Sequence, residues 1–299
     1  MTPMENLLSV FAISRPRYDG GVMSAEQVLN HAVADHRGKI EMPAYAVMVE
    51  SVTSGGFWYS LDAPVGSVQS WLSLTAAAPA RIGQRLFATS RLIQRDDAYG
   101  ALTVQILDDD RDVVCAGVGR CVQVSRGSDA LAAIRHAPPP PPDQPIAGPP
   151  QPRPAPSPID PELDGKQILT GISDGRIAAG ALVDLLSATV TLADDRVRLI
   201  VAPQPWMANP LGAMQGGVVA AILGQACSLA GQTHTAPGQQ YALVDLTAHF
   251  WRSPPVVAGA ITVTTGLHKL GRRIGTVSAL MVAADDVPLA RAVADVQYA

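Results

Sequence analysis

Charged side chains and cysteines are scarce in this sequence. Asp, Glu, Lys and Arg make up 16% of the 299 residues, and the formal net charge is −4. This balance gives no electrostatic reason to expect nucleic acid or an anionic membrane as a partner. The three cysteines (Cys115, Cys121 and Cys227) have no CxxC spacing, so we expect neither a disulfide framework nor a zinc site. Buried free thiols in a reducing cytoplasm are the simpler interpretation.

Several other signals are missing. No apolar run reaches the roughly 18 residues that a membrane-spanning helix needs, and the start of the sequence has no basic segment typical of a signal peptide. There is no P-loop, no dinucleotide-binding GxGxxG and no GxSxG. The sequence therefore predicts a cytoplasmic protein that needs no cofactor or metal and is not a serine hydrolase.

What the sequence does contain is a globular composition interrupted by one proline-rich run. Hydrophobic residues make up 47% of the chain, and its length allows two domains with separate cores. Residues 137–161 hold about half of the 25 prolines, which excludes helix or sheet and favours a semi-stiff tether. We therefore expect an N-terminal module over 1–136, a linker over 137–161 and a C-terminal module over 162–299.

The segments on either side of the linker resemble each other. Residues 70–124 and 246–299 both read as a strand, a segment with Pro and Gly, and further strands separated by a basic turn and an Asp-rich turn. Residues 44–64, interpreted as a bent strand or hairpin, match the apolar spacing of 181–203. This indicates an internal duplication with a period near 150 residues, each copy being one antiparallel unit.

The predicted helices differ between the two copies. Residues 216–232 are apolar all round and rich in small side chains, which predicts a helix buried against a sheet. The first copy offers an amphipathic candidate at 24–38, begun by Ser24 and ended by Gly38. The first module thus either carries its helix ahead of its first strand or has lost its central helix.

Residues 209–226, NPLGAMQGGVVAAILGQA, carry the most specific pattern. They resemble the PaaI-type acyl-CoA thioesterases of the hotdog superfamily, in which Asn, Gly and then His-Gly-Gly open the central helix. Asn209, Gly212 and Gly216-Gly217 match that pattern. The resemblance implies an α+β double hotdog, in which each half is a curved antiparallel sheet around or beside a helix. It also implies action on acyl thioesters.

The chemistry implied by the resemblance begins at the helix N-terminus. Its unpaired N–H groups and partial positive charge can stabilise the oxyanion that forms from a thioester carbonyl. In the family an acidic residue on the helix then acts as nucleophile or base. This sequence departs from the family at both chemical positions, since Gln215 replaces the His and Gly224 stands where the carboxylate is expected. Carboxylates that the first half could supply instead are Glu26, Asp35 and Asp62.

The resemblance implies a site where the two halves meet edge to edge. We expect one such site per chain, because the first half has no glycine-opened helix after its first strand. The small residues Ala220, Ala221 and Gly224 would leave room for an acyl chain. The basic turn HKLGRRIG (268–275) is either a solvated hairpin loop or a contact for the phosphates of coenzyme A. The catalytic candidates are Asn209, Gln215, Gly217 and Gln225, and the substrate-binding candidates are Gly216, Arg252, Lys269, Arg272 and Arg273.

Four functions stay open at this point. The first is an acyl-CoA thioesterase with an unusual acid or base, and the second is a noncatalytic acyl-CoA or fatty-acyl binding protein. A hotdog hydratase is disfavoured because no Asp/His or His/Glu pair occurs at 209–226. A purely structural role in a larger complex is the fourth. The expected partner is an acyl thioester of coenzyme A or of acyl carrier protein, and double-hotdog chains could assemble into a homo-oligomer.

Overall fold

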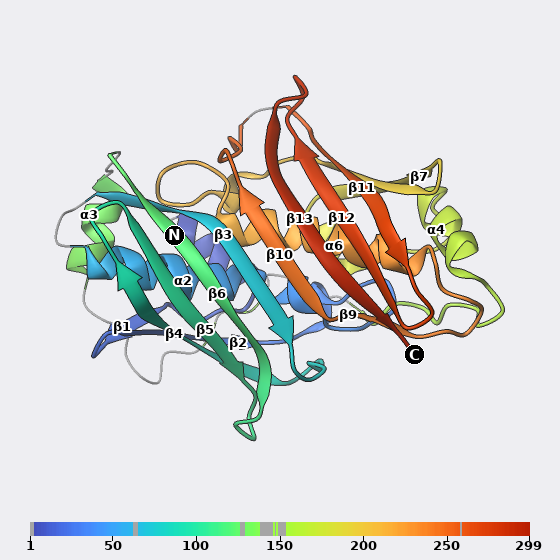
Figure 1. The fold of residues 1–299 in the computed structure, drawn as a ribbon, viewed down its shortest axis with the longest axis horizontal. Helices are drawn as coiled ribbons and strands as arrows, with labels where there is room; N and C mark the ends of the chain where they lie inside the picture. The colour runs from blue at the N-terminus through green and yellow to red at the C-terminus, as the bar shows by residue number, and fades with distance from the viewer. Residues whose placement is uncertain are drawn as a thin grey trace.

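The computed structural model describes residues 3–61, 65–125, 129–137, 146, 148, 154–257 and 259–299. These residues form one curved antiparallel sheet of 13 strands with helices on one face (Figure 1). The strands of the first half are β1 (Arg17–Asp19), β2 (Val22–Val28), β3 (Gly66–Ala76), β4 (Arg85–Arg95), β5 (Tyr99–Leu107) and β6 (Val113–Val124). Those of the second half are β7 (Ala188–Ala193), β8 (Arg196–Val201), β9 (Tyr241–Leu243), β10 (Asp245–Phe250), β11 (Ile261–Leu270), β12 (Ile274–Val282) and β13 (Pro288–Tyr298).

Two long helices, one in each half, occupy the same face of the sheet (Figure 1). They are α2 (Ala46–Ser60), preceded by the 3-10 turn η2 (Met42–Ala44), and α6 (Gly216–Gln232). Both are apolar around most of their circumference, as a helix buried between a sheet and other elements should be. The shorter helical segments are α1 (Pro3–Val10), η1 (His31–Val33), α3 (Asp129–His136), α4 (Gly165–Ser173), α5 (Ala181–Leu185) and η3 (Pro205–Met207).

The order of the strands repeats in reverse around the middle of the sheet. It runs β1-β2-β4-β5-β6-β3 and then β10-β13-β12-β11-β8-β7, with β9 beside β13. The two halves are joined by the antiparallel pair β3–β10, in which Ser73 lies opposite Thr247. The hydroxyls of these two residues, 174 positions apart, are 2.9 Å from each other. The predicted edge-to-edge pairing is therefore confirmed, and the repeat is near 174 residues rather than 150.

The interpretation of residues 44–64 as a strand or hairpin was wrong, because α2 occupies most of this segment. Its β-branched residues and its Gly-Gly pair favour other structures locally, but burial between the sheet and α6 decides the outcome. A Cβ on Gly55 would lie 2.9 Å from the Met23 side chain, and one on Gly56 would lie 3.0 Å from Leu102. The glycines thus let the helix approach the sheet closely. The first half has not lost its central helix.

The amphipathic helix predicted over 24–38 was also wrong. Its first part belongs to strand β2, whose side chains alternate between buried and partly exposed. That alternation has the period of a strand, and β2 pairs with β1 and β4. The supposed match of 181–203 to 44–64 fails for a related reason, since 181–203 contains α5 and the hairpin β7–β8. The place of that hairpin in the strand order corresponds to β1–β2 instead.

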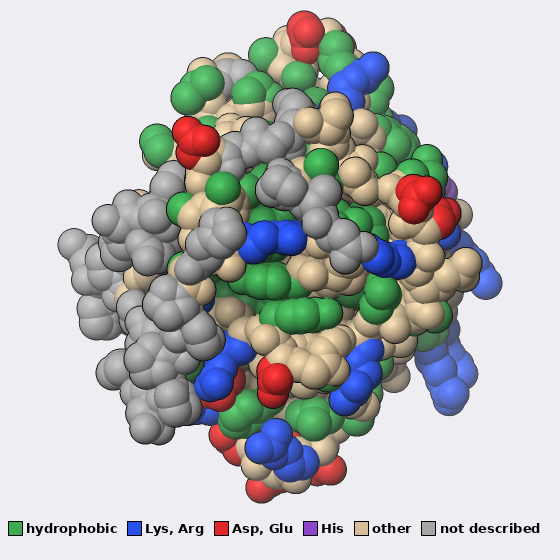
Figure 2. Space-filling model, turned by 90° about the vertical axis from the view of Figure 1, so that its left-hand side faces the viewer, with side chains coloured by type: hydrophobic (Ala, Val, Ile, Leu, Met, Phe, Trp, Pro, Cys, Tyr) green, Lys and Arg blue, Asp and Glu red, His purple; other side chains and the backbone are tan. Residues whose placement is uncertain are grey.

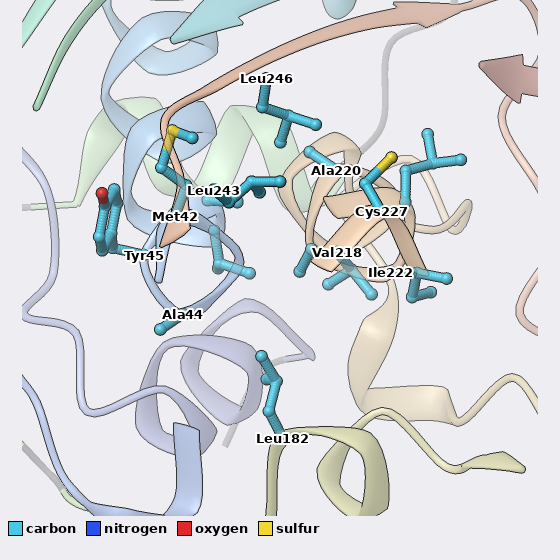
Figure 3. Packing of buried hydrophobic residues seen from close by; sticks show 14 of the residues in the cluster. Met42, Ala44, Tyr45, Leu182, Val218, Ala220, Ile222, Cys227, Leu243 and Leu246 are labelled. Atoms are coloured by element: carbon cyan, nitrogen blue, oxygen red, sulfur yellow. The ribbon is translucent and has the colours of Figure 1, made fainter. Parts of the chain in front are cut away.

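The helices α2 and α6 cross in direct backbone contact. A Cβ on Gly217 would lie 2.5 Å from the Cα atom of Val47 and 2.6 Å from the carbonyl oxygen of Ala46. Only glycine allows this approach. Around the crossing, apolar side chains of η2, α6 and the β9–β10 segment pack into the main core, with Met42, Val218 and Leu246 among them (Figure 3). The crossing therefore fixes the first turn of α6 against the first half.

Most of the proline-rich run lies outside the described residues. The described part at 154–160 contains no helix or strand. The tether over 137–161 and the module boundaries at 136 and 162 stay predictions. Among the described helices, none combines the length and apolar character that crossing a membrane would require.

Candidate functional site

Gln215 is the residue that joins the two halves at the start of α6. It is the N-cap of the helix, and its side-chain oxygen accepts a hydrogen bond from the amide of Val218 at 3.0 Å. Its side-chain nitrogen points the other way, to the carboxylate of Glu50 and to the hydroxyl of Ser51 at 3.3 Å. Gln215 is buried, so these contacts are shielded from water. One side chain therefore caps α6 and holds a carboxylate of α2.

Glu50 is a candidate site residue that the sequence reasoning missed. It lies on α2, is 7% exposed, and comes from the half opposite the glycine motif. A Cβ on Gly216 would lie 3.3 Å from Cγ of Glu50 and 3.4 Å from its Oε1. Burial raises the pKa of Glu50 to about 7, although hydrogen bonds from Ser54 and Gln215 act in the opposite direction. A carboxyl group with this pKa can exchange a proton near neutral pH.

The glycine amides at the start of α6 are available as donors. Within the described part of the chain, the N–H groups of Gly216 and Gly217 donate to no protein acceptor, as expected for a first helical turn. Gly216 is partly exposed, whereas Gly217 is buried against α2. The helix N-terminus thus presents backbone donors beside a carboxylate, which is the pairing that stabilisation and formation of an oxyanion require. We call Glu50, Gln215, Gly216 and Gly217 the carboxylate half-site.

Asn209 shapes the loop that leads to this half-site. Its side-chain oxygen accepts hydrogen bonds from the amides of Leu211 at 2.9 Å and Ala213 at 3.2 Å. Its backbone also pairs with Ala213, and Gly212 in the same turn has a φ of +81°. These bonds make Asn209 a turn-forming residue that positions the approach to Gln215.

Gln225 and Gly224 lie further along α6 and away from the carboxylate half-site. Gln225 is nine residues beyond Gly216, about 13 Å along the helix. It is 1% exposed, and within the described residues its side-chain nitrogen has no hydrogen-bond partner. A Cβ on Gly224 would lie 3.0 Å from Pro43 and 3.1 Å from Leu246. The space expected beside Ala220, Ala221 and Gly224 is therefore filled by protein.

The carboxylates proposed from the first half are not at this place. Glu26 is on β2 and pairs with Arg85 at 2.9 Å, both side chains being largely exposed. Asp35 is buried and pairs with Arg37 at 2.5 Å. Asp62 lies outside the described residues. The sequence analysis expected a carboxylate from the first half, and the one that lies beside Gly216 is Glu50.

The basic candidates are divided between two ends of the second half. Arg252 donates to the carbonyl of Pro288, and its neighbour Pro254 accepts from the amide of Met214, one residue before Gln215. Arg252 thus lies near the approach to the carboxylate half-site. The basic turn is at the other end of α6, because the amide of Tyr298 donates to the carbonyl of Arg273 and its hydroxyl donates to the carbonyl of Gly231. The residues placed there are Lys269, Arg272 and Arg273.

The repeat of 174 residues relates the carboxylate half-site to a second place in the molecule. Glu50 corresponds to Gly224, Gln215 to Glu41, and Gly217 to Pro43. Proline has no N–H group, so the counterpart of the Gly217 amide is missing. We call Arg37, Glu41, Pro43, Gly224 and Ser228 the ion-pair half-site.

The ion-pair half-site is filled by protein contacts. Arg37 pairs with Glu41 at 3.0 Å and with Asp35, and its guanidinium lies 3.6 Å from the ring centre of Tyr241. Glu41 also accepts hydrogen bonds from the hydroxyl of Ser228 and from the amide of Leu243 at 2.9 Å. Each charge therefore has an opposite charge or a hydrogen-bond donor, and the group is a structural network.

One signal in the sequence could have located Glu50. Aligning the halves on their strands gives the repeat of 174 residues. In that alignment Glu50 corresponds to Gly224, the position where the family carboxylate is expected. The wrong assignment of 44–64 to a strand concealed this match, because Glu50 then had no place on a central helix.

Two modules that share one sheet, each with a helix on the same face, define a double hotdog protein. A family model described as the thioesterase superfamily matches residues 211–290. A comparison with curated proteins gives no significant match. The chain thus has the double hotdog fold, and its residues 211–290 are similar to the thioesterase superfamily.

Solved structures with the same fold cover nearly the whole chain. The TesB protein of Mycobacterium avium subspecies paratuberculosis has a TM-score of 0.62 at 9% identity, with 100% of both chains covered. The acyl-CoA thioesterase II TesB2 of Mycobacterium marinum has a TM-score of 0.56 at 10% identity, over 100% of this chain and 98% of that one. The 12:0-ACP thioesterase of Umbellularia californica reaches 0.54 at 10% identity, over 95% and 100%. At these identities the likeness establishes the fold.

Proposed function

We propose that the protein is an acyl-CoA thioesterase whose single reacting centre is the carboxylate half-site. The observation that carries the proposal is the contact across the two halves, in which buried Glu50 of α2 lies against Gly216 and is held by Gln215. Glycine amides on one side and a carboxylate with a pKa of about 7 on the other are suited to thioester hydrolysis.

In the proposed reaction the thioester carbonyl accepts hydrogen bonds from the amides at the start of α6. Ionised Glu50 takes a proton from a water molecule, and the water oxygen attacks the carbonyl carbon. The negative charge that develops on the carbonyl oxygen is stabilised by the helix N-terminus. The carbon–sulfur bond then breaks, the thiolate of coenzyme A receives the proton, and a free carboxylic acid remains.

The alternative of a noncatalytic binder rested on the absence of a carboxylate from α6. Glu50 supplies that group from the first half, which removes the reason for the alternative. The names of structurally similar proteins, acyl-CoA thioesterase II and 12:0-ACP thioesterase, agree with hydrolysis of an acyl thioester. We propose a cytoplasmic location because the three cysteines are buried free thiols.

A thiol-release assay tests the proposal. Wild-type protein is mixed with straight-chain acyl-CoA substrates of increasing length, and an acyl-ACP substrate is run in parallel. We expect release of coenzyme A from the wild type and almost none from Glu50→Gln. Tight binding of every acyl-CoA without release of thiol would show a binder instead.

A further inference from the structure

A second apolar cluster lies at the C-terminal end of α2, separate from the main core. Six buried side chains form it, and Leu211, Ile134, Leu92, Val65 and Tyr59 pack against it while partly exposed. This end of α2, with α3 and β1, is at the left of Figure 1. Figure 2 faces that side and shows hydrophobic side chains in a hollow with Lys or Arg side chains around it. The six buried members are Phe57, Trp58, Leu61, Leu102, Cys121 and Leu131.

The cluster adjoins the carboxylate half-site from two directions. Leu211 belongs to the loop held by Asn209, four residues before Gln215. Cys121 is a buried member of the cluster, and burial first and the charge of Glu50 second raise the pKa of its thiol. The apolar region therefore begins where a thioester carbonyl would be bound.

The spacing on α2 continues this path. Glu50, Ser54 and Trp58 recur every four residues, so they share one face of the helix, and Leu61 follows as its C-cap. From Glu50 to Trp58 the face extends about 12 Å. An apolar chain attached at the carboxylate half-site would thus follow α2 toward its C-terminal end.

Helix α3 covers the far end of this path. Arg135 donates to the carbonyls of Trp58 at 2.8 Å and Leu61 at 3.1 Å, and its guanidinium lies 4.6 Å from the Trp58 ring centre. Leu131, on the same helix, is buried in the cluster at 8% exposure. The cover is therefore anchored to the last turn of α2.

The second half does not build the same cluster. The repeat places Gly231 and Gln232 of α6 where α2 has Phe57 and Trp58. A Cβ on Gly231 would lie 2.9 Å from the side chain of Val296, so the sheet closes directly on the helix there. The aromatic cluster under α3 is a feature of the half that carries Glu50.

We propose that the acyl chain of the substrate lies along α2 in this cluster, and that Leu131 of α3 sets the length of chain that is accepted. This rests on the proposed function and adds the place of the acyl chain and the residue that sets its length. When the acyl chain binds, it takes the place of contacts between Leu131 and α2. A smaller residue at 131 then extends the space, and a larger one shortens it.

The test compares opposite substitutions on α3 with a matched control on α4. Leu131→Ala, Leu131→Trp and Ile168→Ala are assayed by thiol release over straight-chain acyl-CoA substrates from two to sixteen carbons. Ile168 is 7% exposed on a helix of similar length, so it matches Leu131 in burial. We expect the ratio of kcat/KM for long over short chains to rise at least about fivefold in Leu131→Ala and to fall similarly in Leu131→Trp. Ile168→Ala keeps the wild-type ratio.

An unchanged ratio in both Leu131 variants, with wild-type thermal stability, would overturn the proposal. A shift in the same direction in both would also overturn it, because a merely loosened fold cannot distinguish a larger from a smaller space. Absence of turnover in the wild type would refute the proposed function alone. In that case the affinities of the same acyl-CoA series, measured by calorimetry, decide whether Leu131 controls chain length.

Discussion

The two half-sites at the α2–α6 crossing occupy related positions but contain different chemistry. In the carboxylate half-site, Glu50 faces Gly216, which has a free backbone amide. In the ion-pair half-site, Gly224 faces Pro43. Gly224 has no carboxylate, and Pro43 has no N–H group to donate. Each hotdog module contributes residues to both half-sites. One chain can therefore have the reactive groups at the carboxylate half-site and lack them at the ion-pair half-site.

The ion-pair half-site is filled by protein side chains. Glu41, which corresponds to Gln215, forms an ion pair with Arg37 and accepts from Ser228. Buried ion pairs contribute little net stability, but removing one partner leaves a buried charge without compensation. On the proposed function, the same interface serves reaction at one end and cohesion of the two halves at the other. Substitutions should separate these two roles.

The largest expected effect is the loss of turnover in Glu50→Gln. The amide keeps the shape of the side chain but cannot accept a proton from water, so kcat should fall on the order of 10²–10⁴-fold. Thiol release measures this fall. The matched control is Glu26→Gln, an exposed carboxylate of the same half that pairs with Arg85. Wild-type turnover in Glu50→Gln would show that the carboxylate half-site takes no part in the reaction.

The next effect belongs to the ion-pair half-site. Glu41→Leu removes one of the two carboxylates paired with Arg37 and leaves the donors of Ser228 and Leu243 without this acceptor, so it should lower the free energy of unfolding by about 1–3 kcal/mol. Urea denaturation measures the loss. At temperatures where the variant is folded, kcat/KM should remain within a few fold of wild type. Abolished turnover in a folded Glu41→Leu protein would mean that the second place also takes part in the reaction.

The raised pKa of Glu50 predicts a dependence of activity on pH. The proton acceptor is the ionised form, so kcat/KM should rise as the pH increases through about 7 and level off above it. A profile that is flat between pH 5 and 9 would contradict the role of Glu50. The measurement needs only the wild type and one short-chain acyl-CoA.

The same pKa has the opposite consequence for stability. The ordinary pKa of a Glu side chain is 4.5. Below that pH, Glu50 is protonated in both the folded and the unfolded state, so it does not change the free energy of unfolding. Between 4.5 and 7 the unfolded state releases the proton while the folded state retains it, so stability falls as the pH rises. A shift of this size corresponds to about 3 kcal/mol. Glu50→Gln should therefore gain up to that amount over wild type across this range, measured by urea denaturation, and a constant difference would show that burial does not raise the pKa.

The smallest expected effect concerns Gln215. Gln215→Ala removes the side-chain cap of α6 and should cost about 1 kcal/mol of stability. It also removes a hydrogen bond that lowers the pKa of Glu50, so the midpoint of the pH profile should move upward. Gln215→Asn serves as the comparison, because its shorter amide can still cap the helix. An unmoved midpoint in Gln215→Ala would show that Gln215 does not hold the carboxylate.

The strands and the glycine-opened helix could be predicted from the sequence because their patterns are local. Period-two alternation marks β5 and β12, and the small apolar residues of 216–232 mark α6. The segment of α2 could not be predicted in this way. Val47, Val49 and the pair Gly55-Gly56 are poor helix formers, and the helix exists because most of its residues are buried. Glu50 was missed for the same reason, since its role depends on the fold that places it beside Gly216.

The central claim, one reacting centre per chain, is tested most directly by counting bound substrate. Isothermal titration of Glu50→Gln with an intact long-chain acyl-CoA avoids turnover and reports the number of sites. We predict one acyl-CoA per chain. Two per chain would show that the ion-pair half-site also binds substrate, and none would show that the glycine amides of α6 do not hold a thioester.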